Sequence, residues 1–160
     1  MSAKGETRRK LVRLLQLAYS GELAAALAYQ GHARSVKDPQ ERAMITKIEK
    51  DEWEHRETVG RLLADLGARP IRIRELRASV VGNLLSFLCA WMGWFLPMYM
   101  AGKLETKNVE EYDRAAEYAT ALGLDHFLPP LRKMAEAEVL HEKYFFEVVG
   151  KKPPARGDAP

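Results

Sequence analysis

The sequence predicts an all-α protein, an antiparallel four-helix bundle with one long crossover between the second and third helices. Apolar residues recur at helical spacing along most of the chain, and no segment shows the alternation of a half-buried strand. Two short turns and one longer link separate the predicted helices, which is the connectivity of such a bundle. A chain of 160 residues is long enough for one domain with its own core.

The first helix is predicted over residues 8–36 and the second over residues 39–66. Asp38 is suited to cap the second helix, and Pro39 suits its first position, where a missing N–H costs nothing. Gly67 is expected to end this helix, because glycine readily adopts the left-handed conformation found after helix ends.

The crossover begins in the segment "ARPIRIREL", residues 68–76, where Pro70 predicts non-helical structure. A third helical stretch is predicted over residues 79–122, with Gly123 as its stop signal. Pro97 lies inside this stretch and should kink or break it.

The fourth helix is predicted over residues 129–149, opening on a pair of prolines that suits a first turn. The helical domain is therefore expected to span residues 8–150. Flexible tails are expected at residues 1–7 and 151–160, the second of which is rich in Pro, Gly and polar residues.

The charge pattern predicts no nucleic-acid partner, because the net charge is only +3 and the basic residues form local clusters at residues 7–10 and 68–77. Cys89 is the single cysteine, so an intrachain disulfide and a zinc site built on cysteines are both excluded. The beginning of the sequence lacks the pattern of a secretory signal, which favours a cytoplasmic setting.

Residues 78–102 carry no side chain that is charged at neutral pH. Glycines, polar residues and Pro97 dilute this stretch, which disfavours a true membrane span. Two alternatives stay open: a buried core or homodimer interface, and a surface that attaches peripherally to the inner membrane face. Trp91, Trp94 and Tyr99 are residue types that favour the lipid headgroup region.

Two Glu-x-x-His pairs stand out, Glu52 with His55 in "EWEH" and Glu138 with His141 in "EVLH". Residues three positions apart share one face of a helix, so each carboxylate and imidazole could reach a common ion. A single pair of this kind is also common among solvated helical surfaces, so the rest of the chain must supply matching ligands.

Matching ligands are found at the same depth. Glu22 and Glu52 each lie fifteen residues from the first turn, which centres near Lys37. Glu105 lies seventeen residues before the second turn, near residue 122, and Glu138 lies sixteen after it. Because a helix rises about 1.5 Å per residue, the members of each pair sit at equal height in an antiparallel hairpin.

The sequence therefore predicts one inward-facing dimetal site made by six residues: Glu22, Glu52, His55, Glu105, Glu138 and His141. Carboxylates can bridge two ions and neutralise their charge, while imidazole suits iron. Two iron ions are expected, with manganese as the alternative, and O2 or peroxide as the co-reactant. Zinc usually has fewer ligands and often thiolates.

Residues near the predicted site have possible supporting roles. Asp51 could accept a hydrogen bond from a histidine of the opposite hairpin and so orient it, or it could be a surface acid. Three tyrosines share helix faces with Glu22 or Glu105 and could line the site or relay electrons: Tyr19, Tyr29 and Tyr112.

Three further residues are expected to lie apart from the metals. His32 and His126 are close to predicted helix ends, where surface or capping positions are expected. Cys89 is expected in the core.

The ligand pattern resembles the ferritin-like diiron carboxylate proteins, and among them it is most similar to the demethoxyubiquinone hydroxylase family, with rubrerythrins next. The shared features are "GELAAALAYQG", "EWEH", "ARP", the uncharged stretch, Glu105 and "EVLH", and they cover most of residues 8–149. The chain departs from that family in "VEEYD" and "AEVLHEKY", which are less rich in histidine.

The resemblance implies a ferritin-like fold, O2 activation at two irons, membrane attachment through residues 78–102 and hydroxylation of a lipophilic quinone in ubiquinone biosynthesis. Tyr112 matches a tyrosine of that family and is the candidate catalytic residue. A rubrerythrin-like peroxidase or a ferroxidase would use the same ligands, with electrons supplied by an unidentified donor. A helical scaffold with a structural metal is the non-enzymatic alternative.

Overall fold

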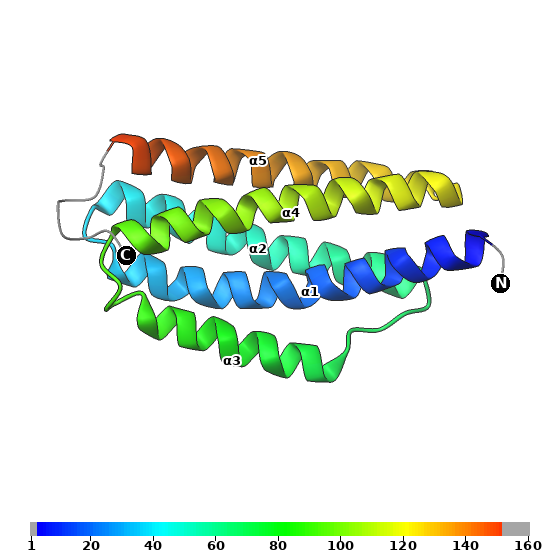
Figure 1. Cartoon of the computed structure of the whole chain (residues 1–160), viewed down its shortest axis with the longest axis horizontal. Coiled ribbons are helices and arrows are strands. Elements are labelled where there is room, and N and C mark those ends of the chain that lie inside the picture. Colours follow the sequence, from blue (N-terminus) through cyan, green and yellow to red (C-terminus); the bar gives the residue numbers. More distant parts are fainter. Residues whose placement is uncertain (1–2, 152–160) are drawn as a thin grey trace.

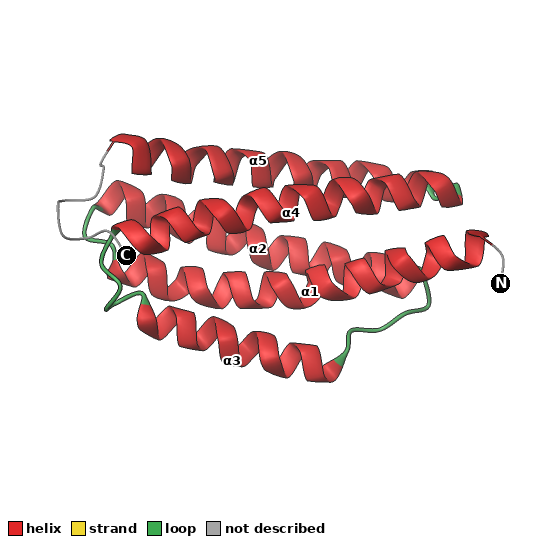
Figure 2. Ribbon diagram, in the orientation of Figure 1, coloured by secondary structure: helices red, strands yellow, loops and turns green. Residues whose placement is uncertain are grey.

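A computed structural model describes residues 3–151 as five α-helices and one 3-10 turn, with no strand among them (Figure 2). The elements are α1 (Ala3–Ser35), α2 (Pro39–Asp65), α3 (Arg72–Leu88), α4 (Phe95–Leu122), η1 (Asp125–Phe127) and α5 (Leu128–Lys151). The all-α class predicted from the sequence is confirmed.

The helices form two antiparallel hairpins, α1 with α2 and α4 with α5, which lie side by side along the long axis of the molecule (Figure 1). Helix α1 also contacts α4, and α2 contacts α5. Helix α3 packs against the outer side of α1 and carries the chain from the end of α2 to the start of α4 (Figure 1).

The predicted ends of the helices are confirmed where turn chemistry specifies them. The Asp38 carboxylate accepts hydrogen bonds from two backbone N–H groups in the first turn of α2, at 2.8 and 3.2 Å, and Pro39 is the first helical residue. Gly67 and Gly123 follow α2 and α4 with φ angles of 62° and 72°. These left-handed conformations favour glycine and fix the two ends.

Several predicted boundaries are wrong. Helix α1 begins at Ala3, so residues 3–7, which lie before the predicted start of the helix, are helical. Helix α5 extends to Lys151, and the remaining tail prediction, for residues 152–160, lies outside the described residues together with residues 1–2. The division into one domain and two tails otherwise stays a prediction.

The crossover also differs from the prediction. Helix α3 begins at Arg72, directly after the extended residue Ile71, so much of the segment predicted as a loop is helical. The helical stretch predicted over residues 79–122 is broken at residues 89–94, so the predicted break is confirmed. Pro97 lies just after the break, in the first turn of α4, where its missing N–H has no helical partner to lose.

Small residues let α3 approach α1 closely. A Cβ atom on Gly82 would lie 2.8 Å from the carbonyl oxygen of Ala24, which is nearer than real side-chain carbons approach. Gly31 of α1 meets the backbone of Ser86 in the same way. The inner face of α3 is therefore fixed against α1.

The outer face of α3 remains exposed. Its large apolar side chains are between 40% and 77% exposed: Ile73, Leu76, Val80, Val81, Leu84, Leu85, Phe87 and, just beyond the helix, Trp91. Most apolar side chains of α3 therefore do not lie in the core of the chain. The helix that meets the length and hydropathy of a membrane span among the described residues is α1, which is weak evidence because core helices of soluble proteins meet the same criteria.

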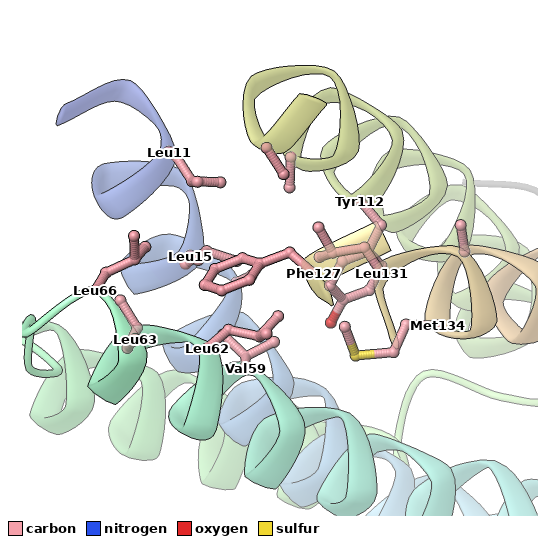
Figure 3. Close-up of a cluster of buried hydrophobic side chains, with 14 residues drawn as sticks. Leu11, Leu15, Val59, Leu62, Leu63, Leu66, Tyr112, Phe127, Leu131 and Met134 are labelled. Carbon is pink, nitrogen blue, oxygen red and sulfur yellow. The ribbon is translucent and has the colours of Figure 1, made fainter. Parts of the chain in front are cut away.

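Two apolar clusters fill the interior of the hairpins. The first cluster gathers side chains from α1, α2, α4, η1 and α5, including Leu15, Leu63 and Phe127 (Figure 3). The second cluster includes Ile48 and Phe145. Along each of the four long helices, a short segment of buried polar residues separates residues of the first cluster from residues of the second.

Candidate metal centre

The structure brings together all six residues predicted as metal ligands. None is more than 7% exposed, and each of the four long helices contributes at least one: Glu22 from α1, Glu52 and His55 from α2, Glu105 from α4, Glu138 and His141 from α5. That the six side chains lie together agrees with the sequence, in which the two glutamates of each hairpin lie at nearly equal distances from its turn. Their role as metal ligands stays a prediction.

The six residues form two overlapping groups, in each of which one potential ligand atom per residue lies within 4.8 Å of the others. The groups are Glu22, Glu52, His55 and Glu138, and Glu52, Glu105, Glu138 and His141. Glu52 and Glu138 belong to both groups. Two neighbouring ions could therefore share these two carboxylates, one from each hairpin.

Glu138 holds both histidines. Its two oxygens lie 3.0 Å from Nδ1 of His55 and 3.2 Å from Nδ1 of His141. Burial alone would raise the pKa of Glu138, but its hydrogen bonds to His141 and His55 outweigh this effect and lower the pKa to about 2. Glu138 is therefore an anion that orients two imidazoles toward the same space.

Glu52 is the opposite case. Neither of its carboxylate oxygens has a hydrogen-bond partner among the described residues, and Oε1 lies 3.6 Å from Nδ1 of His141. Burial, together with the charges of Glu22 and Glu138, raises the pKa of Glu52 well above its ordinary value.

The unpartnered oxygens provide a test of whether a metal fits. Glu22 Oε2 is buried and also lacks a partner within the described part of the chain. Buried polar atoms normally find partners, and carboxylate oxygens beside imidazole nitrogens are a donor set that suits iron or manganese. The residues present therefore fit a pair of such ions.

Two buried tyrosines form hydrogen bonds between the hairpins, one donated from each hairpin to the other. Tyr112 of α4 donates a hydrogen bond to Glu22 of α1, and Tyr29 of α1 donates one to Glu105 of α4. Burial and the nearby carboxylates raise both phenol pKa values well above the ordinary value, so both tyrosines are protonated donors. Each phenol fixes one carboxylate, and the ring of Tyr112 meets His55 edge-on at 6.1 Å.

Asp51 holds the other nitrogen of His141. Its carboxylate lies 3.0 Å from His141 Nε2 and accepts a hydrogen bond from Lys47 at 2.7 Å. Burial would raise the pKa of Asp51, but the bonds to Lys47 and His141 outweigh it and lower the value. The predicted contact with a histidine of the opposite hairpin is confirmed. Lys47 was missed, although its spacing of four residues is a signal for such a pair.

Other predicted neighbours lie elsewhere. Tyr19 does not line the site; its ring lies beneath the guanidinium of Arg56, at 3.7 Å. His126 is exposed, as expected, and Cys89 is buried. The prediction of a surface or capping position for His32 is wrong, because only 2% of this residue is exposed and its ring stacks with Phe145.

Comparison with known proteins gives one family. The sequence profile described as "Ubiquinone biosynthesis protein COQ7" matches residues 9–154. The relative named "NADPH-dependent 3-demethoxyubiquinone 3-hydroxylase, mitochondrial", from Dictyostelium discoideum, is 23% identical over 141 residues, which cover 86% of this chain and 64% of that protein. The chain thus spans just under two thirds of the length of that relative. No solved structure matches the chain significantly.

Proposed function

Because the chain belongs to the ubiquinone biosynthesis protein COQ7 family, we propose that it is a diiron hydroxylase that acts on a lipophilic quinone-like substrate. The observation that supports this most is the buried cluster of four carboxylates and two imidazoles, with unpartnered oxygens on Glu52 and Glu22. Burying these groups without a cation costs stability, so a cation-binding role explains why they lie together.

Two iron ions would share Glu52 and Glu138; Glu22 and His55 would also hold one ion, and Glu105 and His141 would also hold the other. This assignment follows the two overlapping groups. When bound, an iron pair supplies the redox chemistry that activates O2 for insertion into a ring C–H bond. Manganese would suit the same oxygen-rich ligands.

The surrounding side chains are proposed to position the ligands. Asp51 fixes the ring orientation of His141 through its Nε2 atom. Tyr112 is the candidate catalytic residue, because it matches a tyrosine of the family, its phenol hydrogen-bonds Glu22 and its ring also contacts His55. Tyr29 fixes Glu105 in the same way. Packed apolar clusters on both sides of the ligands exclude water from them.

The proposed architecture is a ferritin-like four-helix bundle in which α1, α2, α4 and α5 are the bundle helices and α3 is the crossover. The contacts within the two hairpins and the outer position of α3 support this arrangement. In it, both Glu-x-x-His pairs come from the second helix of a hairpin, as in other carboxylate-bridged dimetal bundles.

The exposed outer face of α3 is proposed to rest on a membrane surface, from which a lipophilic substrate reaches the protein. Exposed apolar side chains such as Val80, Leu84 and Trp91 support this proposal, and Arg72 and Arg77 near the other end of the helix would meet anionic headgroups. Co-sedimentation with anionic liposomes should be lost in V80D/L84D and kept in L140D, which changes a residue on α5 that is more exposed than Val80 and Leu84. Dimerisation without lipid binding would favour the homodimer alternative.

The main test is anaerobic loading with Fe(II), metal analysis, and reaction with O2, a reductant and a demethoxylated quinone. About two irons per chain and a product heavier by one oxygen atom are expected. E52Q and E138Q should lose both results. One tightly bound zinc and no oxidised product would contradict the proposal, and rapid peroxide consumption without quinone would favour the peroxidase alternative.

A further inference from the structure

Arg56 joins three helices and directly follows the proposed ligand His55 in the sequence. Its guanidinium donates one hydrogen bond to the backbone carbonyl of Tyr19 on α1 and another to the carboxylate of Glu75 on α3. The same guanidinium lies over the Tyr19 ring, 3.7 Å from the ring centroid. Arg56 therefore connects α2 to both α1 and α3 next to a residue of the metal centre.

Glu75 extends this connection back to α1. Its other carboxylate oxygen accepts a hydrogen bond of 2.6 Å from Ser20, which precedes the proposed ligand Glu22 by two residues. The side chains of Arg56 and Glu75 are 17% and 21% exposed, and Ser20 is buried. Arg56, Glu75, Tyr19 and Ser20 thus form one largely shielded polar network, called here the Arg56 network.

The Arg56 network holds α1 near Glu22 to α2 near His55, and these two residues belong to the same group of potential ligands. His141 of the other group is oriented by Asp51 through its Nε2 atom. His55 has no such support, because it forms its hydrogen bond through Nδ1 and its Nε2 atom has no hydrogen-bond partner in the described part of the chain. The position of this imidazole therefore depends on how the backbone of α2 is held.

Stability alone does not explain a shielded ion pair at this place. Removing two charges from water costs about as much as their attraction returns, so apolar side chains of similar size could join the helices equally well. An arginine–carboxylate pair adds direction, because the planar guanidinium fixes the relative positions of the groups that it joins. Here those groups are the Tyr19 carbonyl of α1 and the Glu75 carboxylate of α3.

We propose that Arg56 and Glu75 are positioning residues for the metal ion that Glu22 and His55 hold. They fix the separation and rotation of α2 relative to α1, so that one carboxylate and one imidazole reach the same ion. This inference rests on the proposed metal centre but not on the proposed quinone substrate. Loss of the Arg56 network should therefore weaken one of two metal ions and leave the other nearly unchanged.

The test is competitive Mn(II) titration of the full-length protein, which resolves the two affinities. R56M removes the network and one positive charge. Because a positive charge repels a nearby cation, its loss by itself would tighten the binding of metal, so weaker binding in R56M indicates positioning. The matched control is R61M, which removes an exposed arginine of the same helix that is paired with Glu57.

R56M leaves Glu75 without its arginine, which could destabilise the fold. R56M/E75L replaces both partners by apolar residues of similar size, so that neither charge is left shielded and unpaired, and it should keep the urea denaturation midpoint of the wild type. It still lacks the directed contact with the Tyr19 carbonyl. Weaker metal binding in this variant therefore cannot be caused by an unpaired charge.

R56M and R56M/E75L should each weaken one ion by about tenfold or more and leave the other within about twofold, and R61M should change neither. D51N/R56M should weaken both ions, because Asp51 holds a ligand of the other one. Weakening of a single ion in D51N/R56M would place both residues on the same ion and overturn the proposal. Unchanged affinities in R56M, equal weakening of both ions in R56M, or wild-type affinities in R56M/E75L would overturn it as well.

The outcomes also separate this inference from the proposed function. Absence of Mn(II) binding by the wild type would refute the metal centre and the positioning role together. Selective weakening in R56M, in a protein that hydroxylates no quinone, would refute the proposed substrate and leave the positioning role of Arg56 and Glu75 intact.

Discussion

The two hairpins bring equivalent side chains to the centre of the molecule, yet those side chains meet different surroundings. Glu52 of α2 and Glu138 of α5 each begin a Glu-x-x-His pair and lie at matching depth. Glu138 lies within hydrogen-bond distance of both histidines, whereas Glu52 has no hydrogen-bond partner within the described residues. The imidazoles are thus distributed unequally between two equivalent carboxylates.

The difference between Glu138 and Glu52 shows how the buried ligands interact with one another when no metal is bound. One carboxylate can satisfy two imidazole donors, and the other is then left buried beside further carboxylates, which raises its pKa. Bound cations would give both carboxylates the same kind of partner. The comparison therefore predicts that metal removes most of the energetic difference between Glu52 and Glu138.

The largest expected effect is stabilisation by the metal itself. Mn(II), which binds oxygen-rich sites without reacting as Fe(II) does, should raise the free energy of unfolding by about 4 kcal/mol for each site at a concentration a thousandfold above its dissociation constant. Thermal denaturation at increasing Mn(II) measures this. E52Q and E138Q should both lose most of the shift, because both carboxylates are proposed to be shared. A full shift in E52Q would mean that Glu52 binds no metal.

The next effect separates the two carboxylates in metal-free protein. E138Q should lower the free energy of unfolding by about 3 kcal/mol, because it removes the anion that holds two buried imidazoles. E52Q should change it by less than about 1 kcal/mol, because Gln keeps the size of Glu52, removes its repulsion with the neighbouring carboxylates and breaks no hydrogen bond to a histidine. Urea denaturation of both variants measures the difference. Equal losses would show that Glu52 has a partner in solution.

A smaller effect concerns the histidines. Asp51 holds His141, whereas the residue before Glu138 is Ala137, which cannot hold His55 in the same way. D51N should therefore weaken the binding of one of two metal ions by about tenfold to a hundredfold and leave the other nearly unchanged. Competitive Mn(II) titration resolves the two affinities.

The matched control for that experiment is D65N, which changes an exposed aspartate at the end of the same helix. It should leave both affinities unchanged. Equal weakening of both ions in D51N would mean that Asp51 acts on the whole site and not through His141.

The sequence was sufficient where local chemistry fixes geometry. Asp38 and Gly123 mark the two turns, so the depth of each glutamate could be counted from the turn centres near residues 37 and 122, and the six residues do meet. Glu-x-x-His spacing places each pair on one face of its helix whatever the tertiary structure is. The bundle itself, with α3 as its crossover, goes beyond the confirmed all-α class and stays a proposal.

The sequence was insufficient where packing decides. His32 lies near the end of α1, which suggested the surface, but Phe145 from α5 and the α3–α4 loop enclose it. The partner of each phenol also depends on how the hairpins face each other, so spacing alone could not separate Tyr19, which packs with Arg56, from the two tyrosines that hold ligands. Neither fact has a signal in local sequence.

The smallest expected change in stability comes from Tyr29 and Tyr112. Each phenol donates one hydrogen bond to a carboxylate of the other hairpin, but only Tyr112 is proposed to be catalytic, so comparing them tests whether the two hairpins differ in function. Y29F and Y112F should each lower the free energy of unfolding by about 1 kcal/mol, since each removes one buried hydrogen bond to a carboxylate. Their catalytic effects should differ: Y112F should lower kcat for quinone hydroxylation at least tenfold with unchanged iron content, and Y29F should leave kcat within about twofold. Denaturation, metal analysis and turnover of the same preparations measure the free energy of unfolding, the iron content and kcat.

Equal losses of kcat in Y29F and Y112F would mean that both phenols act by fixing carboxylates. Tyr112 would then be a positioning residue, and the hairpins would be equivalent in function as well as in composition.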